Sequence, residues 1–188
     1  MTFNKHTAAF LLAEGAGVLA LMLLVLYLPI WGAPVEQDPL STDMLITYAL
    51  LVLAPLLIFL PLSLALRLGP LWVLGTGSWA MLGYVLFFVD ASGRQDAGFF
   101  TYVAFLALVL AALSSALAVP LAVLNRRFLP PASAATPIMG RALRQGGLLG
   151  LCAVSLMSMS PLGVLNWLNT LLVFTIVALS ELFFLARD

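Results

Sequence analysis

The chain has 188 residues, of which 63% are hydrophobic and only 9% are charged, and its mean hydropathy is +1.14. A soluble domain carries about 25% charged residues, so this composition predicts that the lipid bilayer is the solvent of the folded chain. Eight basic and eight acidic residues give zero net charge, so no basic patch for nucleic acid is present and no nucleic-acid partner is expected.

Six apolar stretches reach the roughly 20 residues that a transmembrane helix needs. In chain order they cover about residues 7–30, 43–68, 70–89, 98–124, 137–160 and 162–186. The first stretch is too long for the apolar core of a signal peptide, so it is interpreted as an uncleaved helix. The sequence therefore predicts an all-α, polytopic bundle of six transmembrane helices. Because every connecting loop is short, residues 1–188 are expected to form a single membrane domain.

Several helix ends carry recognisable signals. Ser41 or Thr42 is suited to cap the second helix, and Gly69 is suited to end it. The sixth helix is expected to follow directly after a short turn at Ser160 and Pro161. Prolines within the second and fourth helices predict bends there, at Pro55, Pro61 and Pro120.

The basic residues indicate the orientation of the bundle. Positive residues are enriched in cytoplasmic loops of membrane proteins. With a cytoplasmic N-terminus, seven basic residues fall on the cytoplasmic side and Arg94 alone on the outer side; the seven are Lys5, Arg67, Arg126, Arg127, Arg141, Arg144 and Arg187. Both termini are therefore predicted to be cytoplasmic.

Small residues indicate where helices pack closely. Ala13 and Gly17 lie four residues apart in the first helix, and Gly146 and Gly150 have the same spacing in the fifth. Small side chains allow helices to approach in lipid. Gly146, Gly147 and Gly150 are expected to let the fifth helix approach the sixth. The spacings suit internal packing and a partner helix equally well.

Ionisable residues within the apolar stretches are few, and each is a candidate for function because buried charge is costly in a membrane. Glu14 lies roughly 13 Å along the helix from Lys5, at about 1.5 Å per residue. It can carry protons or bind a cation, hydrogen-bond a quinone or lipid, or make a structural contact within the chain or with a partner subunit. The structural contact is favoured, because no second polar residue must lie at its depth.

Arg144 and Glu181 are predicted to form a buried or half-buried ion pair. The fifth and sixth helices must run antiparallel, which places the two residues within roughly 3–4 Å in depth at about 1.5 Å per residue. Arg141, one turn away, is the alternative partner and can instead reach lipid phosphate. In the competing interpretation, Arg144 extends to the interface and Glu181 faces water or a neighbouring subunit.

Other polar residues do not form a recognisable catalytic or metal site. Asn166 and Asn169 lie on one face of the sixth helix, where hydrogen bonds between helices are favoured over a lipid head-group contact. His6 is the only histidine and Cys152 the only cysteine, which excludes bis-histidine haem ligation, a three-histidine zinc site and an intrachain disulfide. No base lies within the apolar segments to activate a nucleophile. No enzyme activity, metal or cofactor is therefore predicted.

One segment resembles a known family. Arg141-Ala-Leu-Arg-Gln-Gly, followed by Asn166-Trp167-Leu-Asn169 and Glu181-Leu-Phe-Phe, is similar to a stretch of a family of small bacterial polytopic membrane proteins to which no activity is assigned. The resemblance covers about residues 141–185. It implies a multi-pass protein of the bacterial cytoplasmic (inner) membrane and no catalytic function.

Two functions are compatible with this sequence. The favoured one is a non-catalytic accessory or scaffolding subunit of a larger membrane complex, because small-residue faces are plentiful and polar interior residues are scarce. Small hydrophobic subunits are frequent in respiratory and photosynthetic electron-transport assemblies, so the expected partners are other membrane subunits of such a complex, together with the lipid bilayer. The alternative is a transporter or channel for a small solute, which the proline bends and Glu14 favour.

Overall fold

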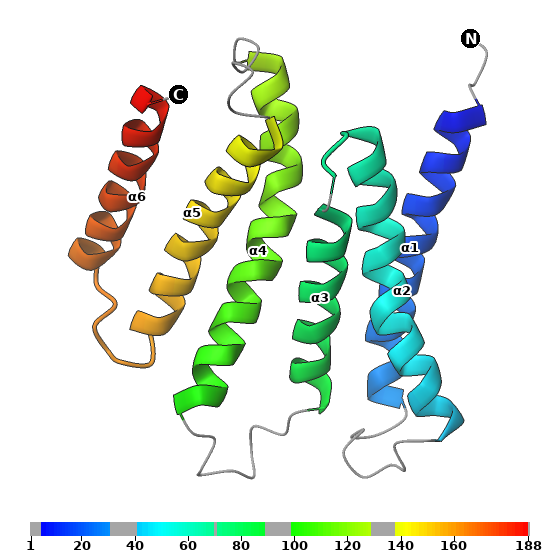
Figure 1. Cartoon of the computed structure of the whole chain (residues 1–188). Coiled ribbons are helices and arrows are strands. Elements are labelled where there is room, and N and C mark those ends of the chain that lie inside the picture. Colours follow the sequence, from blue (N-terminus) through cyan, green and yellow to red (C-terminus); the bar gives the residue numbers. More distant parts are fainter. Residues whose placement is uncertain (1–4, 31–40, 70, 89–98, 129–137, 188) are drawn as a thin grey trace. The chain divides into compact units, whose positions relative to one another are not determined.

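The computed structural model describes residues 5–30, 41–69, 71–88, 99–128 and 138–187, and these residues form six α-helices and no strand. The helices are α1 (Lys5–Ile30), α2 (Thr42–Ala65), α3 (Leu71–Phe88), α4 (Phe99–Phe128), α5 (Ile138–Met159) and α6 (Trp167–Arg187) (Figure 1). The predicted all-helical class is confirmed.

Four of these helices are long and apolar enough to cross a membrane, namely over Met44–Ala65, Thr101–Asn125, Gly140–Met159 and Trp167–Ala186. The described parts of α1 and α3 contain shorter apolar stretches, Leu12–Val25 and Leu71–Phe87. The protein therefore has the helices of a multi-pass membrane protein.

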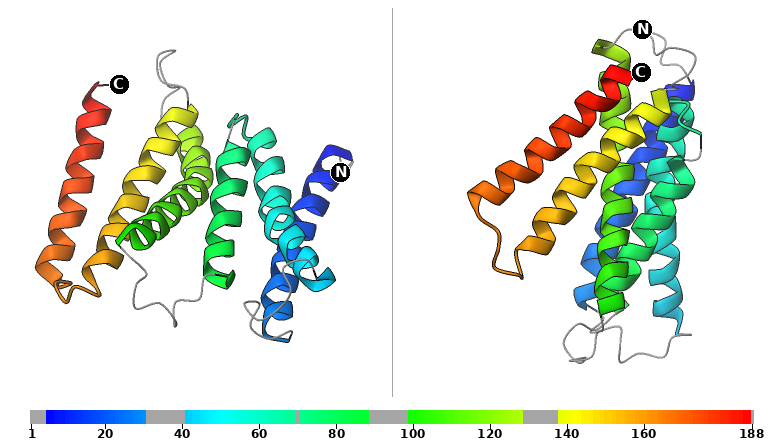
Figure 2. Two further views of the ribbon diagram at one scale, coloured as in Figure 1. Left: turned by 60° about the horizontal axis from the view of Figure 1, so that its bottom comes forward. Right: turned by 60° about the vertical axis from the view of Figure 1, so that its left-hand side comes forward.

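The chain divides into two compact units, residues 1–108 and 109–188. In the first unit α2 lies between α1 and α3 and runs antiparallel to both (Figures 1 and 2). Glycines let these helices meet. A Cβ placed on Gly75 of α3 would lie 2.6 Å from the Phe59 ring of α2, and Gly83 faces Leu51 in the same way. Helices in lipid associate by such close van der Waals contact.

In the second unit α5 lies between α4 and α6. Gly146 and Gly150 face α4, because a Cβ on Gly146 would lie 2.6 Å from the Ser114 carbonyl oxygen and one on Gly150 would lie 2.9 Å from Ser114 Oγ. The expectation that these glycines face α6 is wrong. The small residues of α4 explain the difference, since the short side chains of Ser114 and Ala118 let the backbone of α4 come close to the glycines, whereas most side chains of α6 are larger.

The turn between α2 and α3 ends α2 three residues earlier than the sequence predicts. Leu68 N donates to Ser63 O (2.9 Å) and Arg67 N to Leu64 O (3.3 Å), the two bonds of a Schellman motif. Arg67 occupies its left-handed position with φ +50°. Glycine is the usual residue at this position of the motif, because it has no Cβ to crowd the left-handed conformation. The residue after Arg67 is Leu68, which the motif buries (1% exposed).

Local capping also decides where α2 and α6 begin. Ser41 Oγ accepts from Met44 N (3.4 Å), which confirms Ser41 as the cap of α2. α6 begins at Trp167, five residues later than predicted. Gly163 N donates to Ser160 O (3.1 Å) to close a turn, and Asn166 then accepts from Asn169 N (2.8 Å) as the cap of α6.

Candidate functional site

A polar cluster joins α4, α5 and α6 in the second unit. Gln145 Nε2 donates to Glu181 Oε1 (2.8 Å), and Asn125 Nδ2 donates to Gln145 Oε1 (2.8 Å). Arg144 Nη2 lies 3.6 Å from the same Glu181 oxygen. We call Asn125, Arg144, Gln145 and Glu181 the α4–α6 polar cluster. It links the three helices through side-chain contacts, in addition to the close contact of α5 with the α4 backbone at Gly146.

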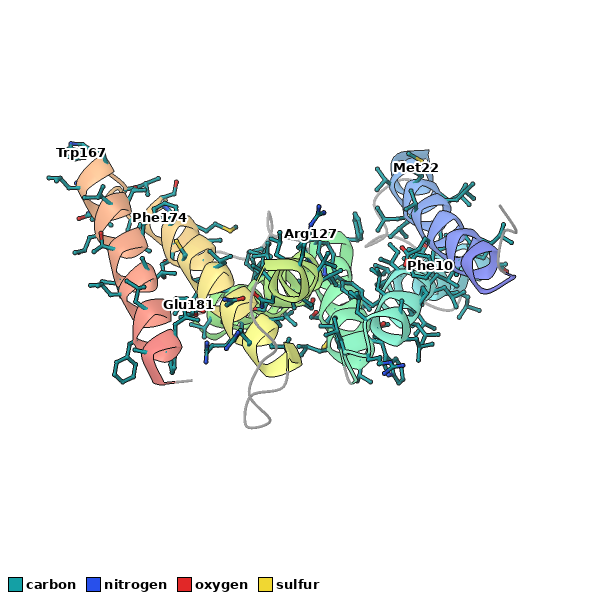
Figure 3. All side chains as sticks on the ribbon, turned by 90° about the horizontal axis from the view of Figure 1, so that it is seen from above. Phe10, Met22, Arg127, Trp167, Phe174 and Glu181 are labelled. Carbon is teal, nitrogen blue, oxygen red and sulfur yellow. The ribbon has the colours of Figure 1, made fainter. Side chains whose placement is uncertain are left out.

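The antiparallel arrangement of α5 and α6 brings these residues to one depth. Figure 3 shows Glu181 on the side of α6 that faces α5. Phe184, one turn further along α6, lies under the guanidinium group, with Arg144 Cζ 4.8 Å from the ring centroid. Such a cation–π contact orients the arginine beside its carboxylate partner. The structure therefore brings together Arg144 and Glu181, the two residues that the sequence pairs.

The cluster is mostly removed from solvent. The Arg144 and Glu181 side chains are 21% and 20% exposed. Glu181 Oε2 is buried without a hydrogen-bond partner among the residues the structure describes, so one carboxylate oxygen receives both contacts. Removing one member of a buried charged pair leaves the other uncompensated, so the cluster couples the positions of α5 and α6. The cluster therefore has the character of a structural contact that holds α4, α5 and α6 together.

Two members of the cluster, Asn125 and Gln145, are absent from the sequence prediction. The sequence does offer a clue to Gln145, because it is a polar residue directly after Arg144 in a largely apolar stretch and so lies at nearly the same depth. Asn125 could not be found in this way because the packing of α4 on α5 is set by Gly146 and Gly150, not by the loop between the helices. Arg141 is half-buried one turn before Arg144.

The second candidate region lies on α1 in the first unit. Gly17 is buried against α2, where an added Cβ would lie 2.7 Å from Ile58 Cγ1, and Ala13 is half-buried. Glu14 is half-buried beside them, and its Oε1 atom is buried with no hydrogen-bond partner within the described part of the chain. Figure 3 shows Phe10, one turn earlier, on the side of α1 next to α2.

Asn166 and Asn169 form hydrogen bonds within the start of α6. Besides the Asn166 cap, Asn169 Nδ2 donates to Val164 O (2.7 Å). These bonds differ from the expected hydrogen bonds between helices. The reason is local, because the first turn of a helix has unsatisfied backbone groups that a nearby asparagine meets at little cost in chain entropy.

Among the described residues, no group of three or more His, Cys, Asp and Glu side chains is arranged to hold a metal ion. Comparison with known proteins gave no match to a protein-family model, a curated protein or a solved structure.

Proposed function

We propose that the chain is a six-span protein of the bacterial cytoplasmic membrane, with both termini in the cytoplasm, and that it serves as a non-catalytic accessory subunit of a larger membrane complex. An electron-transport assembly is the proposed setting. The proposal rests on the character of α6, the seven-to-one division of basic residues and the resemblance of residues 141–185 to bacterial polytopic proteins.

The exposure of α6 carries the proposal. No residue of its apolar stretch Trp167–Ala186 is fully buried within the described chain, and most of its large side chains are exposed along the whole helix. Examples are Leu172 (57% exposed), Leu179 (60%) and Phe183 (63%). The hydroxyls of Thr175 and Ser180 donate to carbonyls of their own helix (2.8 Å each), so these polar groups require no outside partner.

A helix with this surface is suited to lie against lipid or against another membrane subunit. The α4–α6 polar cluster fixes one end of α6 to α5. The exposed faces of the helix then have a defined orientation, which a subunit that holds a neighbour requires.

Purification in mild detergent tests this function. The accessory role predicts that the intact chain elutes with other membrane proteins in a fixed ratio, and that the complex shows the absorption bands of redox cofactors bound by those partners. A single species containing copies of this chain alone would contradict it.

The orientation is tested separately with single cysteines and a reagent that does not cross the membrane. Cysteines at residue 4, within residues 125–136 and after residue 187 should be labelled only after the membrane is opened. Cysteines beside Glu36 and Arg94 should be labelled in intact cells. Protection of the position beside Glu36 would overturn the orientation.

A transporter or channel for a small solute is the second candidate. Its specific support is the pair of buried carboxylate oxygens, Glu14 Oε1 and Glu181 Oε2, that lack hydrogen-bond partners among the described residues. Three prolines lie within α2 and α4, where they weaken the helical hydrogen bonding. A monodisperse homo-oligomer in the same purification would favour this function.

A further inference from the structure

The contact between α1 and α2 gives Glu14 a defined depth. Gly17 meets α2 at Leu57 and Ile58, where an added Cβ would lie 3.2 Å from Leu57 Cβ and 3.2 Å from Ile58 N. Glu14 precedes Gly17 by three residues, which is about 4.5 Å along α1 and on the same side of the helix. Because α2 runs antiparallel to α1, the same step along α2 leads to residues 60 and 61. Glu14 is therefore level with Pro61.

Pro61 leaves a backbone acceptor open in this part of α2. Proline has no N–H group, so the carbonyl four residues earlier, that of Leu57, loses its usual helical donor. The nearby Ser63 hydroxyl donates to Leu60 O (2.8 Å), not to Leu57. An unsatisfied carbonyl in an apolar environment is destabilising, so a donor at this depth would stabilise the pair of helices.

Glu14 is a side chain that can become that donor. Its Oε1 atom is buried and has no hydrogen-bond partner among the described residues. An ionised carboxylate only accepts hydrogen bonds, whereas a protonated carboxyl also donates one. Only the protonated carboxyl can therefore meet the carbonyl that Pro61 leaves open.

The charged groups on the two helices lie away from this point. Asp43 is in the first turn of α2, 18 positions before Pro61, and Arg67 is exposed in the turn after α2. On α1 itself, Lys5 and His6 lie at the beginning of the helix, more than two turns before Glu14.

We propose that Glu14 is a proton-binding site, in which the protonated carboxyl donates a hydrogen bond to the Leu57 carbonyl oxygen that Pro61 leaves open. The proton ties α1 to α2 next to the contact at Gly17. This site is independent of the accessory role, because it requires nothing from a partner protein.

Infrared spectroscopy of the full chain in detergent tests whether the Glu14 carboxyl is protonated. At neutral pH the wild type should show the C=O band of a protonated carboxyl that is absent in Glu14→Gln. The band should shift in Pro61→Ala, where the new N–H group competes for the Leu57 carbonyl. If the band is absent, or if Glu14 gives carboxylate bands that change between sodium and potassium, the residue is ionised or binds a metal cation, and the proposal is wrong.

A double-mutant cycle tests the partner. Glu14→Leu should lower the ratio of folded to unfolded protein about fivefold in the wild-type background, as expected for one lost hydrogen bond. The loss should be much smaller with Pro61→Ala and unchanged with Pro55→Ala, the matched control six positions away. Glu14→Gln keeps a donor and should remain close to wild type. Equal losses in the two proline backgrounds would exclude the bond to Leu57.

Discussion

At the scale of single residues, the glycines of α5 differ sharply in what surrounds them. Gly146 lies against the backbone of α4, where an added Cβ would meet the Ser114 carbonyl oxygen at 2.6 Å and Ala118 N at 3.2 Å. A Cβ added to its neighbour Gly147 would have no atom of another described helix within 4 Å. Two adjacent glycines of one helix therefore provide a substitution and its matched control.

We predict that Gly146→Ala lowers the free energy of unfolding by about 1–3 kcal/mol, because backbone atoms of α4 cannot yield to the added methyl group as a flexible side chain would. Gly147→Ala should be neutral or stabilising by up to about 1 kcal/mol, since alanine favours the helix. Denaturant unfolding in detergent measures both. Similar losses at the two positions would show that α5 does not meet α4 through Gly146.

Arg67 adopts a left-handed backbone conformation, which is unfavourable for any residue that carries a Cβ atom. It has φ +50° in the turn between α2 and α3. Arg67→Gly should therefore raise the free energy of unfolding by up to about 1 kcal/mol, while Arg67→Ala should not, because alanine retains the Cβ that crowds this conformation. An equal gain for both variants would assign the effect to the lost charge and not to the backbone.

Arg144 and Glu181 are predicted to be energetically coupled. In a double-mutant cycle with Arg144→Ala and Glu181→Ala, the coupling should lie in the range of about 0.5–3 kcal/mol that residues in contact show. Glu181→Gln keeps a carbonyl acceptor for Gln145 and should cost less than Glu181→Ala. Additive losses, within about 0.3–0.5 kcal/mol, would mean that the 3.6 Å approach contributes nothing to stability.

The sequence predicts which residues come together where the connection between two helices determines the depth of each residue. Arg144 and Glu181 lie on consecutive antiparallel helices joined by residues 160–166 alone, so counting residues back from each helix end gives nearly the same depth for both. The partners of Gly146 and Asn125 depend on which helix face α5 presents to α4. Loop length does not determine that rotation, and so sequence reasoning assigned Gly146 to α6 and omitted Asn125.

At the scale of elements, apolar length predicted the existence of every helix, but local hydrogen bonds decided where helices begin and end. Ser41 caps α2 as its residue type suggests. α6 begins late because the backbone of residues 160–166 is held by its own turn and by Asn166 and Asn169. Apolar residues such as Leu162 continue through this segment, so hydropathy alone cannot find the boundary.

The cap of α6 gives a prediction at this scale. Asn166→Ala removes the acceptor for Asn169 N and should cost about 0.5–2 kcal/mol. Amide hydrogen exchange should accelerate in the first turn of α6 and remain unchanged near Glu181. Thr175→Val is the control, because the Thr175 hydroxyl donates to a carbonyl of its own helix further along α6. This variant should leave the amide protons of the first turn protected from exchange. Unchanged exchange at Asn169 in Asn166→Ala would contradict the capping role.

At the scale of the whole molecule, composition predicted the helical class and the multi-pass character, while the function remains a proposal. The reason is physical. The lipid bilayer and a partner helix both accept an apolar surface, so composition predicts that a helix is apolar but not what lies against it.

Photocrosslinking in native membranes tests the accessory role most directly. A photoreactive amino acid at Leu172, on the exposed surface of α6, is compared with one at the half-buried Val177, on the side of α6 that carries Glu181. We expect Leu172 to form an adduct of one defined mass with a different membrane protein, whereas Val177 should crosslink within the chain. Adducts of Leu172 with lipid alone, or with a second copy of this chain, would contradict it.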